Sequence, residues 1–147
     1  MAASNNEEQL RRLVVELRMM QGSAEILQQR LELLRTAIAD LQVAESSLRA
    51  LKEIEEGKPV LVPVGGGVLA DAKLGDLRKV IVGIGANISV EMDIDMAVED
   101  VSSRLTEVEK ASQSVQQQLQ QILAQMQVHQ DGVNRLSARL RGESVGV

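Results

Sequence analysis

Residues 57–93, GKPVLVPVGGGVLADAKLGDLRKVIVGIGANISVEMD, set the architecture of this chain of 147 residues. This stretch holds most of the glycines and both prolines, and short runs of β-branched residues alternate with glycine-containing turns. Such runs are typical of short strands, and the turns mark where the chain reverses. We therefore predict two β-hairpins, with strands at residues 60–64, 68–74, 80–84 and 88–92.

The predicted strands have more apolar surface than one small sheet can bury. Val60–Leu61–Val62 and Val80–Ile81–Val82 are apolar on both faces, which is typical of strands buried on both sides. Isolated hairpins are marginally stable in water, and open strand edges pair readily. We therefore expect an obligate oligomer in which the hairpins close a shared sheet or barrel. The expected oligomerisation residues are Val60, Leu61, Val62, Val64, Val80, Ile81, Val82, Ile84, Ile88 and Val90.

Heptad patterns flank this stretch on both sides. Apolar residues recur at alternating steps of three and four from Leu10 to Leu48, with one polar interruption at Glu45. They recur in the same way from Val98 to Leu140, with polar interruptions at Ser112 and His129. A period of 3.5 sustained over about five heptads predicts a coiled coil. The expected fold is a single domain, mainly α with a small β part. It consists of a first coiled-coil helix (6–56), the two hairpins (57–93), a second coiled-coil helix (94–141) and a flexible tail (142–147).

The register of the predicted antiparallel helical hairpin stays open at this point. If Leu10 takes position a, the seams match when facing residue numbers add up to 146, as for Leu10 with Leu136. They match equally well when the numbers add up to 153, as for Leu13 with Leu140. The heptad pattern supports both alternatives.

Composition excludes several classes of protein. There is no Phe, Trp, Tyr or Cys, and the net charge is −5. The absence of cysteine excludes disulfides and thiol chemistry, and an acidic chain without aromatic rings is poorly suited to nucleic acids. No apolar run approaches the roughly 20 residues of a membrane span, and the polar N-terminus is no signal peptide. We expect a cytoplasmic protein that binds neither nucleic acid nor membrane.

No motif points to catalysis. His129, the one histidine, falls at a d position and is interpreted as a polar residue of the coiled-coil seam. The GxG at Gly83–Gly85 lacks the third glycine and the helix of a dinucleotide site, and Gly65–Gly67 lacks the lysine of a P-loop. We expect no enzyme, no cofactor and no metal.

The linker between the helices resembles that of archaeal-type α-class prefoldin subunits. The resemblance rests on LVPVGGG at residues 61–67, KVIVGIG at residues 79–85 and the acidic start of the second helix at Asp93. It implies a single prefoldin-like domain within a hexamer of two α and four β-class subunits, which has a β-barrel body and six coiled-coil arms. It also implies an ATP-independent holdase that binds unfolded proteins at the arm tips and passes them to a group II chaperonin. The linker is similar to γ-type prefoldins as well, which form filaments.

Apolar residues outside the seam suggest where clients would bind. Val14, Val15 and Met19 form a second stripe near the predicted arm tip, and Ile26 and Leu33 continue it, where packing on a neighbouring arm is an alternative. Scattered exposed aliphatics are also normal on any surface. The expected client-binding residues are Leu10, Leu13, Val14, Val15, Leu17, Met19, Met20, Val133, Leu136 and Leu140.

Three hypotheses follow for the function of the chain. The first is the α-class holdase, the second a filament-forming γ-type prefoldin, and the third a generic coiled-coil adaptor whose hairpins only mediate assembly. A mixed complex with a β-class subunit favours the first, and long polymers of this chain alone favour the second. A discrete homo-oligomer without anti-aggregation activity favours the third.

Overall fold

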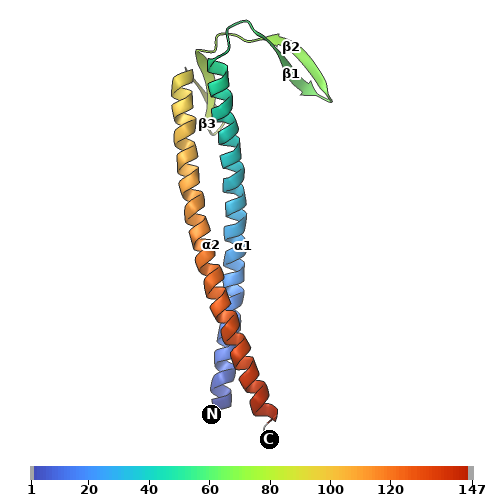
Figure 1. Ribbon diagram of the computed structural model, residues 1–147, viewed down its shortest axis with the longest axis vertical. Coiled ribbons are helices and arrows are strands. Elements are labelled where there is room, and N and C mark those ends of the chain that lie inside the picture. The colour runs from blue at the N-terminus through green and yellow to red at the C-terminus, as the bar shows by residue number, and fades with distance from the viewer. Residues whose placement is uncertain (1, 146–147) are drawn as a thin grey trace. The chain divides into compact units, whose positions relative to one another are not determined.

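The computed structural model describes residues 2–145, and side chains up to residue 142. It confirms the predicted arrangement of two long helices and two small antiparallel sheets (Figure 1). The elements, in order, are α1 (Ala2–Lys52), β1 (Pro59–Gly65), β2 (Val68–Lys73), β3 (Lys79–Gly85), β4 (Ile88–Asp93) and α2 (Ile94–Val145). The chain divides into two compact units: a terminal unit (Met1–Arg35 with Lys110–Val147) and a central unit (Thr36–Glu109).

Three of the four predicted helix ends need correction. Helix α1 begins at Ala2 rather than at residue 6 and ends at Lys52 rather than at residue 56. At its end, the backbone N–H groups of Glu53 and Ile54 donate to carbonyls three residues back, at 3.1 and 3.2 Å, which tightens the last turn. Helix α2 begins at residue 94 as predicted but continues to Val145.

The extension of α2 passes through Gly142, which the sequence had suggested as its end. A glycine inside a helix costs only about 1 kcal/mol relative to alanine, so it need not stop one. Residues 142–145 of the predicted flexible tail are therefore helical, and residues 146–147 lie outside the described residues.

Burial confirms the heptad assignment. In the described chain, every a and d position from Leu10 to Leu48 and from Val98 to Leu140 is buried or half-buried, including the polar ones. Glu45, the polar interruption at position a, is 23% exposed and pairs with Arg49 at 3.0 Å. The core of the terminal unit consists of Leu27, Leu31 and Val115, with Leu34, Leu119 and Ile122 packed against it. An aliphatic seam thus holds α1 and α2 together.

Contacts select one of the two possible registers. In the terminal unit, Glu16 bonds to His129, and a Cβ at Gly132 would lie 3.2 Å from Leu13 Cδ1, so facing numbers add up to 145. In the central unit, Lys52 pairs with Asp95, and these numbers add up to 147. Both units therefore have the register in which facing numbers add up to about 146.

The strands form two separate two-stranded antiparallel sheets, β1–β2 and β3–β4. The β3–β4 turn places Ala86 and Asn87 at φ 51° and 59°, and positive φ at both central residues gives the twist that tight hairpins require. Gly66 and Gly67 serve the same purpose in the β1–β2 turn, at φ 59° and 79°. The backbone therefore explains the glycine-rich turns of the sequence.

A short connection links the two hairpins. The N–H of Gly57 donates to the carbonyl of Leu74 at 2.7 Å, which extends the β1–β2 ladder. In the connection, the carboxylate of Asp76 accepts hydrogen bonds from the backbone N–H and the guanidinium of Arg78 at 2.7–3.1 Å. Hydrogen bonds from the Arg78 side chain and backbone lower the pKa of Asp76 to about 2, so the Asp76 carboxylate stays charged at any physiological pH.

Candidate functional site

Hairpin β3–β4 has one apolar face. Val80 pairs with Met92 and Val82 with Val90, and residues that lie directly opposite each other share a face. Ile88 continues this face toward the turn, because alternate residues of a strand point the same way. Ile84 lies at an irregularity in the strand register between Gly83 and Gly85. The opposite face is mostly polar. Only Ile81, which lies opposite Glu91 and is 77% exposed, is a large apolar residue there.

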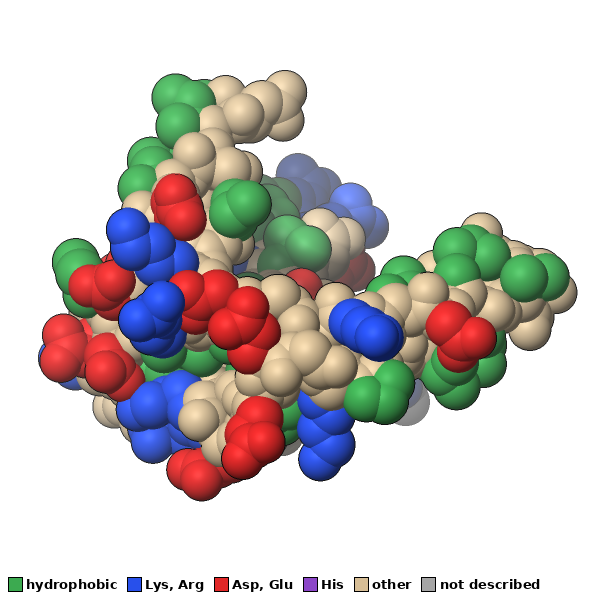
Figure 2. All heavy atoms as spheres, turned by 90° about the horizontal axis from the view of Figure 1, so that it is seen from above, with side chains coloured by type: hydrophobic (Ala, Val, Ile, Leu, Met, Phe, Trp, Pro, Cys, Tyr) green, Lys and Arg blue, Asp and Glu red, His purple; other side chains and the backbone are tan. Residues whose placement is uncertain are grey.

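Hairpin β1–β2 is apolar on both faces, as predicted for its first strand. The pairs Val60–Ala72 and Val62–Ala70 share one face. Leu61 and the pair Pro63–Leu69 lie on the other face, together with Asp71 and Lys73. Figure 2 shows hydrophobic side chains on both sides of the hairpin that extends to the right. This hairpin therefore has two surfaces that favour burial.

The chain itself leaves most of these surfaces open. Of the ten predicted oligomerisation residues, only Val60, Val80 and Val82 are half-buried. The other seven are exposed, from 38% at Val90 to 77% at Ile81. In the described chain each sheet has only two strands, so each hairpin also has two unpaired edges. Apolar surface next to open edges is suited to pairing with further strands.

One helix side chain anchors the second hairpin within the central unit. Arg104 of α2 donates from Nη1 to the carbonyl of Gly83 in β3 at 3.3 Å. The same guanidinium pairs with Asp100 one turn earlier at 2.9 Å. Arg104 thus ties β3 to the start of α2. This contact was not predicted, because only the folded hairpin brings Gly83 to the helix.

The structure divides the ten predicted client-binding residues into exposed and seam residues. Val15 and Met19 are 55% and 69% exposed on the outer surface of α1. Leu136 is buried, and the remaining seven are half-buried. Only Val15 and Met19 are therefore fully available in this structure, and the others lie in or beside the seam.

An open hollow in the terminal unit adds to this apolar surface. It is lined by Met19, Met20 and Ile122, with Glu16, Ser23, Gln125 and His129 around them. Ile122 was expected only as a seam residue. Its place beside the methionines depends on the register, which the heptad pattern alone left open. The hollow joins the exposed Met19 to the seam.

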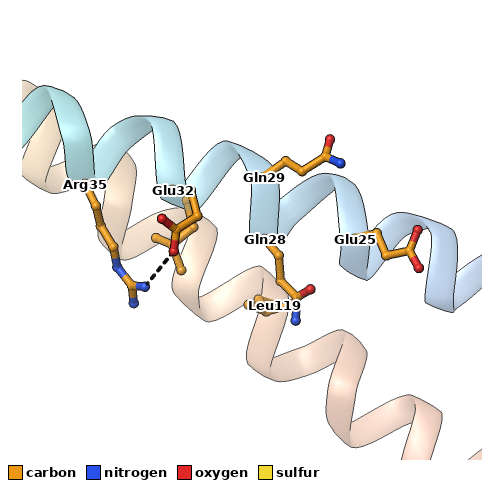
Figure 3. A pocket seen from close by; sticks show the side chains of 7 residues that line it. Glu25, Gln28, Gln29, Glu32, Arg35 and Leu119 are labelled. Carbon is orange, nitrogen blue, oxygen red and sulfur yellow. Dashed lines mark ion pairs between the residues drawn. The ribbon is translucent and has the colours of Figure 1, made fainter.

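A second depression on the same unit is polar. Glu25, Gln28, Gln29, Glu32 and Arg35 of α1 line it with Leu31 and Leu119, and Glu32 pairs with Arg35 at 3.6 Å (Figure 3). The polar side chains are long and exposed, with two carboxylates and one guanidinium among them. Among the described residues, no group of three or more His, Asp or Glu could hold a metal ion.

His129 makes a polar contact across the seam. Its Nε2 lies 2.8 Å from Glu16 Oε2, and its Nδ1 lies 3.0 Å from the carbonyl oxygen of Gln125. When the ring is protonated, both nitrogens donate, so both contacts favour the charged form. The hydrogen bond to Glu16, and then that to Gln125, raises the pKa of His129 above its ordinary value of 6.5.

This pair predicts a pH-dependent stability. Because the folded pKa is raised, the stabilisation is complete below about 6.5 and is lost as pH rises through the folded pKa. We expect the melting temperature of the chain, measured by circular dichroism, to decrease as the pH is raised from about 6 to about 9. His129→Gln should remove this part of the slope, and Glu16→Gln should do the same. An unchanged slope in both variants would show that the pair does not stabilise the fold.

Comparison with known proteins gives the family. A model of the prefoldin subunit family matches residues 20–139, which is most of the chain and includes parts of both units. The chain belongs to the prefoldin family. A prefoldin subunit alpha of Pyrococcus horikoshii is 40% identical over 115 residues, covering 78% of this chain and 77% of the relative. Another, of Methanopyrus kandleri, is 37% identical over 123 residues, covering 81% and 78%.

A solved prefoldin structure supports the fold. The filamentous prefoldin of Methanocaldococcus jannaschii, determined by cryo-electron microscopy, superposes with a TM-score of 0.65 at 28% identity. The match covers 75% of this chain and 91% of that chain. Assembly of prefoldin subunits makes the β-barrel body, which explains why a single chain leaves its hairpins apolar and open.

Membership of the family sets the broad function. Prefoldins are chaperones rather than enzymes, and they assemble with other prefoldin subunits. The resemblance to prefoldin subunits is therefore confirmed. In the described part of this prefoldin, neither helix contains a stretch long and apolar enough to cross a membrane.

Proposed function

We propose that this prefoldin is an α-class subunit that holds unfolded proteins in the cytoplasm without ATP. In this proposal, two copies assemble with four β-class subunits and pass their clients to a group II chaperonin. Two observations support the α class: the chain carries two β-hairpins, and the relatives named above are α subunits. We also propose that both compact units belong to one prefoldin domain, since the family match includes parts of each.

The exposed apolar surface of the terminal unit carries the holdase proposal. Val15 and Met19 stand on the outer surface of α1, and Met19 adjoins the hollow lined by Met20 and Ile122. Methionine is unbranched and polarizable, so its side chain adapts to partners of different shape. A surface that must hold many unfolded chains needs such adaptability more than a fixed fit. Leu10, Leu13, Leu17 and Val133 are half-buried nearby and would enlarge this surface if the helix ends separated.

Replacing Val15 and Met19 together by glutamate should weaken client binding. Each side chain offers an apolar contact of about 1 kcal/mol, so the concentration needed to suppress aggregation should rise roughly tenfold or more. The measurement is light scattering of a chemically denatured model enzyme after dilution into the assembled complex. Val43→Glu is the matched control, because Val43 is 66% exposed on α1 but lies in the central unit.

The control should suppress aggregation like the unchanged protein, and all variants should keep their helix content. Equal suppression by the double variant and the control would remove Val15 and Met19 from the client site. The holdase proposal would then have to rest on the half-buried residues of the seam.

A filament is the second candidate. The filamentous archaeal structure shares the fold at 28% identity, whereas the α subunits of Pyrococcus and Methanopyrus are 40% and 37% identical. Sequence identity therefore favours the α-subunit hypothesis, and the structural match supports the filament as the second hypothesis. Electron microscopy of the purified chain alone distinguishes them, since only the filament form gives long polymers without a partner.

A further inference from the structure

The outer surface of α1 carries a second apolar stripe that the coiled-coil seam does not use. Val15, Met19, Ile26 and Leu33 are 55%, 69%, 58% and 73% exposed. Gly22 and Gln29 lie between them at the missing steps, so the stripe advances by alternating steps of four and three residues. We call these six positions the outer stripe. All of them lie in the terminal unit, on the side of α1 away from its a and d positions.

The spacing of the outer stripe indicates what can cover it. A repeat of 3.5 residues keeps a stripe in line only against another helix that winds around it, as in a coiled coil. Isolated exposed aliphatics have no such repeat. The outer stripe therefore has the form of a second helix-binding seam.

Charges beside the outer stripe indicate which helix fits. Arg11, Arg18, Glu25 and Glu32 follow one another at steps of seven along one side of it, and all four are exposed. The column is thus positive in its first half and negative in its second. When two copies of the helix lie antiparallel, their columns have matching charges. Arg11 of one copy then faces Glu32 of the other, and Arg18 faces Glu25. Among the described residues, Arg11, Arg18 and Glu25 form no ion pair, and Glu32 pairs with Arg35 at 3.6 Å (Figure 3).

We propose that the outer stripe binds the same stripe of a second copy of this chain, with the two α1 helices antiparallel. In this pairing Val15 faces Ile26 of the other copy and Met19 faces Gly22, so the first four positions of the outer stripe meet. Gln29 and Leu33 lie beyond this contact, opposite Arg12 and Glu8. An added Cβ at Gly22 would meet nothing within 4 Å, so there is open space for the methionine side chain. The large Met19 therefore fits against the small Gly22, next to the layer formed by Val15 and Ile26.

Two other arrangements fit less well. Moving the copies one heptad apart brings all six positions together, with Val15 opposite Leu33, but it sets Glu25 against Glu25 of the other copy. A parallel pair sets Gly22 against Gly22 and leaves a gap in the seam. The parallel pair also needs Glu16 as a partner for Arg11, and Glu16 already bonds to His129 at 2.8 Å. Exposed ion pairs contribute little affinity, but they select orientation and register in coiled coils.

The contact has a consequence for chaperone activity. Pairing covers Val15 and Met19, the two exposed residues of the proposed client site. Paired copies would therefore compete with clients for one surface. The pairing itself does not depend on the proposed function, because it follows from the outer stripe and its charges.

Disulfide formation tests the pairing directly, because the full chain contains no cysteine. Val15→Cys and Ile26→Cys are made as separate full-length variants, mixed in equal amounts and oxidised. The antiparallel pairing predicts that the disulfide between the two different variants dominates over both homodisulfides. Val128→Cys mixed with Ile26→Cys is the matched control, since Val128 is 65% exposed on α2 outside the outer stripe. Dominant homodisulfides, a yield no higher than the control, or a stronger link between residues 15 and 33 would each overturn the proposal.

Charge reversal gives an independent readout. Arg18→Glu, introduced into both cysteine variants, converts two attractions of the pair into repulsions and should lower the yield of the mixed disulfide about tenfold. Glu25→Arg should have the same effect, and combining both substitutions should restore the yield. An unchanged yield in the single variants, or no recovery in the combination, would refute the charge-matched register. Neither result depends on the aggregation assay, so failure of this proposal and failure of the holdase proposal can be told apart.

Discussion

Replacing Ile88 and Val90 together by aspartate should convert the assembled protein into single chains. Both side chains lie on the apolar face of β3–β4 and are 55% and 38% exposed in the single chain. The substitutions therefore leave the chain's own core intact. In the assembly this face is expected to be buried, and burying an unpaired carboxylate costs several kcal/mol. Association should weaken by roughly a thousandfold or more.

Sedimentation velocity measures this loss of assembly. Ser89→Asp is the matched control, since Ser89 lies between the two positions but on the opposite, mostly polar face, next to the native Glu91. The control should assemble like the unchanged protein. If the double variant also assembles normally, the apolar face of β3–β4 is not the assembly surface.

Replacing Leu31 by alanine should destabilise the terminal unit by about 2–5 kcal/mol. Leu31 is 6% exposed and packs with Leu27 and Val115 in the core of that unit. A thin seam has few neighbouring side chains that can move to fill a cavity. The loss should therefore approach the upper part of this range.

Leu33→Ala provides a control with the same change of side chain two residues away. Leu33 is 73% exposed, so its replacement should change the free energy of unfolding by no more than about 0.5 kcal/mol. Urea denaturation followed by circular dichroism compares the two variants at equal protein concentration. Similar losses for both would contradict the assignment of Leu31 to the seam and Leu33 to the surface.

The helical part of the fold could be predicted because its signal is local and repeated. Each a or d residue from Leu10 to Leu48 and from Val98 to Leu140 indicates the same helix face. A polar residue such as Glu45 does not obscure this pattern. The helix ends could not be predicted as well. The end of α1 at Lys52 depends on two backbone hydrogen bonds, and no residue type marks the continuation of α2 through Gly142.

The register of the helices illustrates a limit of the pattern itself. A shift by one heptad leaves every a residue next to a d residue, so the seam residues alone cannot choose. The choice appears only in contacts such as Glu16–His129 and Lys52–Asp95. The link between His129 and Glu16 was missed for the same reason, although His129 was correctly placed in the seam.

The candidate surfaces could be predicted in part. The sequence indicated apolar hairpins but could not assign faces, because the face of Ile81 follows from its pairing with Glu91. Val15 and Met19 stood out because they interrupt the polar outer surface of a predicted helix. The hollow beside Ile122 required the register of the helices, which the sequence left undecided.

This prefoldin is proposed to function as an α-class subunit in a mixed complex. The most direct test is the mass of the purified chain, alone and mixed with a β-class prefoldin subunit, by size-exclusion chromatography with light scattering. We predict a defined complex with the mass of two copies of this chain and four β-class subunits. Long polymers of this chain alone, without any mixed complex, would contradict the claim and favour the filament form.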